Sequence, residues 1–102
     1  MDFDTYFLAF ILRGPAWTPV ESPDLYRLQA AHLAHLTSLR ESGQLLLNGP
    51  CTDGGNLRGV SVYKVASLAE AQALANEDPM VQAGRLVIEF HPWLVPAGSR
   101  LP

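Results

Sequence analysis

The segment that most constrains this chain is Tyr6–Leu12, a continuous run of aliphatic and aromatic residues that ends shortly before Gly14. Successive side chains of a β-strand point to opposite faces of its sheet. The two resulting sets are Phe7, Ala9 and Ile11 on one face and Tyr6, Leu8, Phe10 and Leu12 on the other. Both sets are apolar, whereas a strand with one solvated face alternates between apolar and polar residues. The run therefore predicts a strand that is covered on both faces.

Further helix and strand signals follow in the order of two strand–helix–strand units. Strands are expected over 6–12, 44–48, 59–65 and 85–93, and helices over 25–42 and 67–76, with a short turn over 78–84. Ser22 and Pro23 are typical of a helix start, and Ser67 with Glu70 forms a capping box. Right-handed crossovers fold two such units into a four-stranded antiparallel sheet with both helices on one face. The predicted fold class is α+β, in the ferredoxin-like βαββαβ arrangement.

The length of 102 residues fits one domain, with a core over about 5–94 and a tail over 95–102 that is loose or docked on a neighbour. Two helices cover only one face of the sheet, so the second apolar face of the first strand needs another partner. We therefore expect a homodimer packed sheet to sheet. The alternative is a monomer that exposes an apolar face.

The charge balance argues against polyanionic partners. The chain has 10 acidic and 7 basic residues and a net charge of -3, without a basic cluster. Nucleic acid and anionic membranes are both held by basic surfaces, so neither is an expected partner. A single cysteine, Cys51, permits no intrachain disulfide, and the acidic Met1–Asp4 segment is unlike a signal peptide. These features predict a cytoplasmic protein.

The first predicted helix contains the most informative candidate residue. Leu28, His32 and Leu36 share one narrow helical stripe, and His35 lies at the edge of that stripe. One interpretation is a core histidine bonded to a backbone carbonyl, and the other is a general acid or base at the floor of a cleft. The two histidines could begin a metal site, but no third ligand follows at a fixed spacing. We therefore predict that no metal and no organic cofactor is needed.

The topology brings the Trp17 loop, the Asp53 turn and the Asp78 turn to one end of the sheet, where a pocket is expected. Asp78 precedes Pro79, which is an ordinary helix start, although a capping carboxylate can also face a pocket. Asp53 lies beside two glycines, as turn residues do. Trp17 is either a lid or a dimer contact. Our candidates for contacts with a substrate at this end are Trp17, Asp53 and His35.

A wider pattern resembles the YciI-like (YCII-related) family over Tyr6–Trp93. It consists of His32-Leu33, Gly43, Gly49-Pro50, Asp53, Ser67, Glu70-Ala71, Asp78-Pro79, Ala83-Gly84 and Pro92-Trp93. The resemblance implies a dimeric α+β barrel and an active site built on a paired histidine and aspartate, which map to His32 and Asp78. The wider superfamily includes isomerases and lyases of aromatic breakdown beside haem-handling and regulatory members. The family often has an aromatic residue at the position of His35.

Three functions follow from these observations. The first is an enzyme that moves a proton on a small cyclic oxygenated substrate, as an isomerase or lyase, with His32 as base or acid and Asp78 orienting its ring. The second is a ligand-binding or regulatory dimer without catalysis. The third is a structural dimer in which His32 is a satisfied core residue.

Overall fold

The computed structural model describes residues 2–100. Its central element is the long strand β1 (Phe3–Arg13). β1 pairs on one side with β3 (Leu57–Tyr63) and on the other with β4 (Leu86–Pro96), and β2 (Leu45–Pro50) extends the sheet beyond β3. All pairs are antiparallel, and the strand order is β2-β3-β1-β4. This four-stranded sheet is the predicted α+β, ferredoxin-like arrangement.

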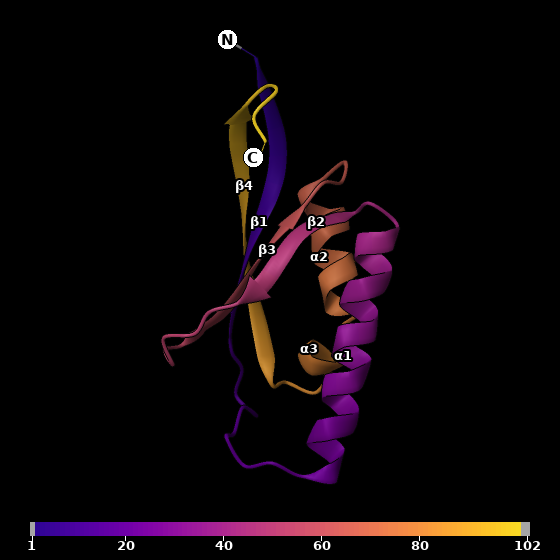
Figure 1. Cartoon of the computed structure of the whole chain (residues 1–102), viewed down its shortest axis with the longest axis vertical. Coiled ribbons are helices and arrows are strands. Elements are labelled where there is room, and N and C mark those ends of the chain that lie inside the picture. The colour runs from indigo at the N-terminus through magenta and orange to yellow at the C-terminus, as the bar shows by residue number, and fades with distance from the viewer. Residues whose placement is uncertain (1, 101–102) are drawn as a thin grey trace.

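The helices α1 (Pro23–Glu41), α2 (Leu68–Asn76) and α3 (Pro79–Gln82) lie together on one side of the sheet (Figure 1). The predicted start signals work as expected: the Ser22 side chain accepts a hydrogen bond from the backbone N–H of Leu25. Ser67 accepts from the Glu70 backbone, while the Glu70 carboxylate accepts from the backbone N–H of Ala66. Gly43 follows α1 with φ +80°, a conformation that residues with a Cβ rarely adopt.

The end of β4 lies further along the chain than the sequence indicates. Register pairing of β1 with β4 runs from Arg13 opposite Leu86 to Phe3 opposite Pro96, and the backbone N–H of Ala97 donates to the backbone carbonyl of Asp2. Residues 95 and 96 therefore belong to the sheet and not to a loose tail, because their backbone is paired within the same chain. Residues 1, 101 and 102 of the predicted domain lie outside the described part of the chain.

The hydrophobic core lies between the sheet and the helices. Phe7 and Ala9 of β1 are buried against Leu39 of α1 and against Ala71 and Ala75 of α2. Within residues 2–100, no helix covers the other face of the sheet. Leu47 and Trp93 on that face are 51% and 45% exposed, and a shallow apolar groove runs over Tyr6, Leu47, Val62 and Trp93. None of the described helices is both long and apolar enough to cross a membrane.

Candidate active site

A cavity of about 470 Å³ lies between α1 and the sheet. On the α1 side the cavity is lined by Leu25, His32 and Leu36, which belong to the sheet-facing stripe of this helix. The opposite wall comes from the strands and includes Ile11, Ser61, Tyr63 and Ile88. Trp17 from the long loop before α1 also lines it, as does Asp78 from the junction of α2 and α3. The volume is in the range of pockets that hold small molecules.

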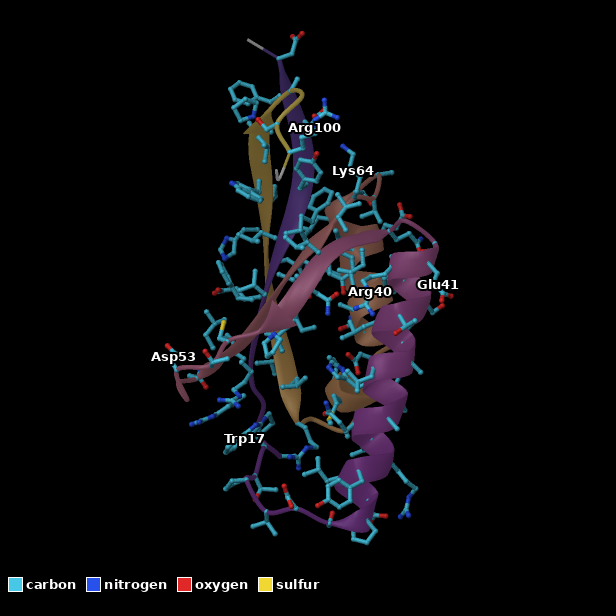
Figure 2. All side chains as sticks on the ribbon, in the orientation of Figure 1. Trp17, Arg40, Glu41, Asp53, Lys64 and Arg100 are labelled. Atoms are coloured by element: carbon cyan, nitrogen blue, oxygen red, sulfur yellow. The ribbon has the colours of Figure 1, made fainter. Side chains whose placement is uncertain are left out.

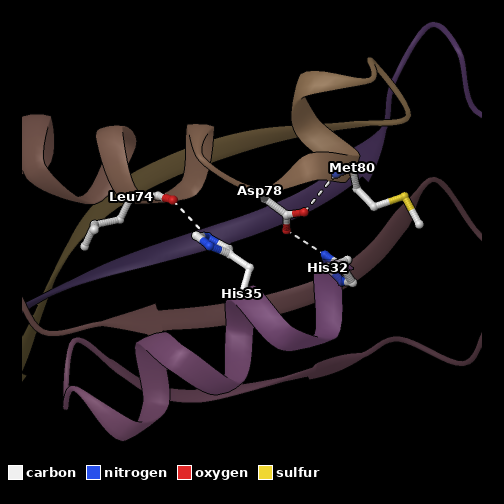
Figure 3. A network of polar contacts seen from close by, with 5 residues as sticks. All are labelled: His32, His35, Leu74, Asp78 and Met80. Carbon is white, nitrogen blue, oxygen red and sulfur yellow. Dashed lines mark hydrogen bonds and ion pairs between the residues drawn. The ribbon is translucent and has the colours of Figure 1, made fainter. Parts of the chain in front are cut away.

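His32 and Asp78 meet at this cavity (Figure 3). The distance from His32 Nδ1 to Asp78 Oδ2 is 2.6 Å, and their side chains are 18% and 5% exposed. The second carboxylate oxygen, Oδ1, accepts a hydrogen bond of 2.9 Å from the backbone N–H of Met80. Asp78 therefore caps α3 and contacts His32 with the same carboxylate. This contact is possible because α3 packs against α1, which folds the Asp78 turn inward.

The Asp78 contact determines which nitrogen of His32 is available to a ligand. A carboxylate can only accept hydrogen bonds, so Nδ1 carries a proton and donates it to Asp78 Oδ2. In the neutral ring the lone pair is then on Nε2. A histidine held in this way can take a proton at Nε2, and the resulting imidazolium is stabilised by the carboxylate beside Nδ1.

His35, three residues further along α1, has a different environment. Its Nε2 donates a hydrogen bond of 3.0 Å to the backbone carbonyl of Leu74 in α2 (Figure 3). His35 does not line the cavity, so the structure does not bring it together with His32 and Asp78. Its contact with a substrate stays a prediction. Within residues 2–100, no group of three or more histidine, cysteine or acidic side chains could hold a metal ion.

Trp17 lines the cavity, and its loop contacts Arg13, Arg58 and Arg85. The guanidinium carbon of Arg13 is 4.2 Å from the centroid of the Trp17 ring, and that of Arg58 is 5.6 Å from it. Arg85 donates hydrogen bonds to the backbone carbonyls of Ala16 and Thr18, on either side of Trp17. Cation–π contacts and these hydrogen bonds hold the indole at the cavity.

Asp53 lies away from the cavity, at the exposed turn between β2 and β3 (Figure 2). That turn does approach the Trp17 loop, since Arg13 donates to the carbonyl of Gly54. The topology thus brings the turn to the predicted end of the sheet, but the Asp53 side chain does not line the cavity with the other candidates. Its contact with a substrate also stays a prediction. Cys51 is a free thiol next to the same turn.

Tyr63 is a cavity residue that the sequence analysis missed. It is 2% exposed, and burial followed by the negative charge of Asp78 raises its pKa to about 12. Its hydroxyl therefore stays protonated at neutral pH. Gly59, Ser61 and Tyr63 alternate along β3 and line the same cavity. Small and polar residues at alternate positions of an apolar strand are the signal that could have identified this wall.

The fold and the site together define a ferredoxin-like domain with a His–Asp pair at an internal cavity. A family model described as the YCII-related domain matches residues 10–93, and the chain belongs to that family. No curated protein matches the chain. A solved structure with a similar fold is 5-chloro-2-hydroxyhydroquinone dehydrochlorinase (TftG) from Burkholderia phenoliruptrix, in complex with 2,5-dihydroxybenzoquinone. It is 23% identical, with a TM-score of 0.64 over 86% of this chain and 92% of that one.

Proposed function

We propose that this protein is a small-molecule enzyme that transfers a proton on a cyclic oxygenated substrate, as a lyase or isomerase. The observation that carries the proposal is the 2.6 Å contact between His32 Nδ1 and Asp78 Oδ2 at the wall of the cavity. A histidine that only filled the core would need a partner but no adjacent space. His32 has both a carboxylate partner and a cavity large enough for a ligand.

In the proposed reaction His32 is the general base and then the general acid. Nε2 takes a proton from a carbon next to a carbonyl or enol, and the electron pair of that C–H bond forms a new double bond. In an elimination the leaving group departs with its own electron pair, and in an isomerisation His32 returns the proton to another carbon. Asp78 orients the ring and stabilises the imidazolium. Tyr63 supplies a neutral hydroxyl that can donate a hydrogen bond to a substrate oxygen.

The similarity to TftG supports this class of chemistry. TftG is called a dehydrochlorinase, and loss of hydrogen chloride from a ring removes a proton and a chloride from the substrate. The ligand in its complex, 2,5-dihydroxybenzoquinone, is a small cyclic oxygenated molecule. Both features agree with the reaction proposed for His32, which uses neither a metal nor an organic cofactor.

We also propose that the protein is a homodimer whose sheets pack face to face. The supporting observation is the apolar groove over Tyr6, Leu47, Val62 and Trp93, on the sheet face opposite the helices. Contiguous apolar surface of this kind is unusual on a monomer and common at subunit interfaces.

The cytoplasm remains the proposed compartment of this protein. The single free cysteine supports this proposal, and cell fractionation tests it.

Catalysis is tested by adding 5-chloro-2-hydroxyhydroquinone to the purified protein and measuring chloride release. We expect turnover, and we expect His32→Ala and Asp78→Asn each to lower kcat by roughly 100-fold or more, because general acid–base catalysis contributes that much. Asp24→Asn is the control, since it removes an exposed carboxylate of α1 that pairs with Arg27. It should leave kcat unchanged.

A ligand-binding protein without catalysis would give a different result. In that case calorimetry would detect binding of 2,5-dihydroxybenzoquinone, but neither this chlorinated substrate nor related chlorinated hydroquinones would be turned over. Turnover that survives His32→Ala in a folded protein would also overturn the proposed role of His32.

A further inference from the structure

Two arginines line the same cavity as His32 without being needed for the proton transfer. Arg58 is in β3, and Arg85 immediately precedes β4. Ion pairs in residues 2–100 are Arg27 with Asp24, His32 with Asp78 and His91 with Glu89, so neither cavity arginine is paired with a carboxylate. Arginine without an acidic partner at a small-molecule cavity is well suited to bind an anion, because its guanidinium presents several N–H donors in a fixed plane.

From this arrangement we propose that the preferred ligand of this cavity is an anion, a single planar ring that carries a carboxylate, and that Arg58 and Arg85 bind the carboxylate. The proposal rests on the proposed function only in assuming that the substrate binds beside His32. It adds a substrate class and two substrate-binding residues to that site.

Both guanidinium groups have their orientation fixed while keeping donors available. Arg58 donates one hydrogen bond, 3.1 Å long, to the carbonyl of Gly55. Arg85 donates to Thr18 at 2.9 Å and more weakly to Ala16 at 3.5 Å. A guanidinium has five N–H donors, so these backbone contacts leave further donors on each side chain. Because the side chains are already held in place, less conformational entropy is lost when an anion binds.

The preference for a planar ring comes from Trp17. Its indole lines the cavity, and the guanidinium carbon of Arg58 is 5.6 Å from its centroid. A ligand ring can pack on an aromatic side chain while its carboxylate reaches the neighbouring arginine. A flexible aliphatic acid would gain less from this surface and would lose more conformational freedom.

The charges around the cavity also orient such a ligand. Arg58 and Arg85 contact the Trp17 loop and its neighbouring turn, whereas the carboxylate of Asp78 is next to His32. An anionic group is repelled by Asp78 and attracted by the arginines, so the carboxylate should bind at the Trp17 end and the reacting carbon should face His32. Glu21 also lines the cavity, where it accepts a hydrogen bond from the Tyr26 hydroxyl. Its charge opposes anion binding.

The test compares two probes with the same ring, 2,5-dihydroxybenzoate and its neutral amide, by calorimetry at neutral pH. We expect the acid to bind about tenfold more tightly than the amide, as charge-assisted hydrogen bonds allow. Arg58→Gln and Arg85→Gln should each weaken binding of the acid about fivefold or more and leave the amide unchanged. Arg27→Gln is the matched control, because Arg27 is exposed and pairs with Asp24 outside the cavity. Glu21→Gln should tighten binding of the acid.

Arg85→Gln could disturb the Trp17 loop, so a second measurement uses the unmodified protein. Raising the salt concentration should weaken binding of the acid and not of the amide, because mobile ions screen the arginines. Equal affinities for acid and amide, or an acid affinity insensitive to both salt and Arg58→Gln, would overturn the proposal. Arginine-dependent binding without turnover would contradict only the proposed catalysis. His32-dependent turnover of neutral rings, with a KM unchanged by Arg58→Gln, would contradict only the anionic ligand.

Discussion

At the scale of single residues, the site depends on which groups keep their protons. Tyr63 is the clearest case, because burial and the nearby Asp78 carboxylate raise its pKa to about 12. Its hydroxyl is a hydrogen-bond donor over the whole physiological range and cannot act as a base there. In the proposed reaction Nε2 of His32 therefore accepts the proton, and Tyr63 donates a hydrogen bond to a substrate oxygen.

The raised pKa of Tyr63 predicts how alkali affects stability. A tyrosine that ionises near pH 10 when unfolded and near pH 12 when folded favours the folded state fully below pH 10, and this contribution is lost as the pH rises to about 12. The wild type should therefore lose about 1 kcal/mol more than Tyr63→Phe between pH 8 and pH 11. Urea unfolding at both pH values measures the difference.

Tyr26, whose pKa is also raised, does not affect the comparison of wild type with Tyr63→Phe. The hydrogen bond to Glu21, and to a lesser extent desolvation, raises the pKa of Tyr26, which is present in both proteins. Identical alkaline destabilisation of wild type and Tyr63→Phe would contradict the prediction. Activity measurements on Tyr63→Phe at neutral pH then report on the hydroxyl as a hydrogen-bond donor.

At the scale of elements, the short helix α3 connects the site to the fold. Asp78 is its N-cap, and replacement of a capping side chain by alanine costs about 1 kcal/mol. Asp78→Asn keeps an oxygen that can accept from Met80, whereas Asp78→Ala removes it. We expect both variants to lose activity and Asp78→Ala to be about 1 kcal/mol less stable than Asp78→Asn, as measured by urea unfolding. Equal stabilities would show that the cap contributes little.

Local sequence patterns were sufficient to predict the strands and helices, and the helical stripe that contains His32. The contact between His32 and Asp78 was harder to predict, because a rise of 1.5 Å per residue places His32 about 12 Å along its helix, away from the end where Asp78 was expected. The packing of α3 against α1 closes this offset, and such packing depends on tertiary contacts. Arg58 and Arg85 were missed for the same reason, since nothing in their immediate neighbours distinguishes them from solvated arginines.

At the scale of the whole molecule, the two faces of the sheet have different environments. Phe7 is buried beneath the helices, whereas its neighbour Leu8 points to the face that no described helix covers. In the proposed dimer, Leu8→Arg should give a folded monomer, and Phe7→Arg should unfold the chain, because an unpaired charge would be buried in the core. Light scattering gives the mass and circular dichroism gives the helix content. A wild-type chain that is folded and monomeric at micromolar concentration would contradict the proposed dimer.

Side chains alternate along β1, so adjacent residues of this strand lie on opposite faces of the sheet. One residue faces the cavity, and the next lies on the face opposite the helices. Ile11 lines the cavity, while Phe10 lies on the other side, with its ring 5.5 Å from that of His91. Inserting one residue into β1 would exchange these two positions and reverse every following side chain of the strand. Substitutions that keep the length of β1 can change either face separately, but a single insertion or deletion changes both at once. The spacing of residues along this strand is therefore under a stricter constraint than their individual identities.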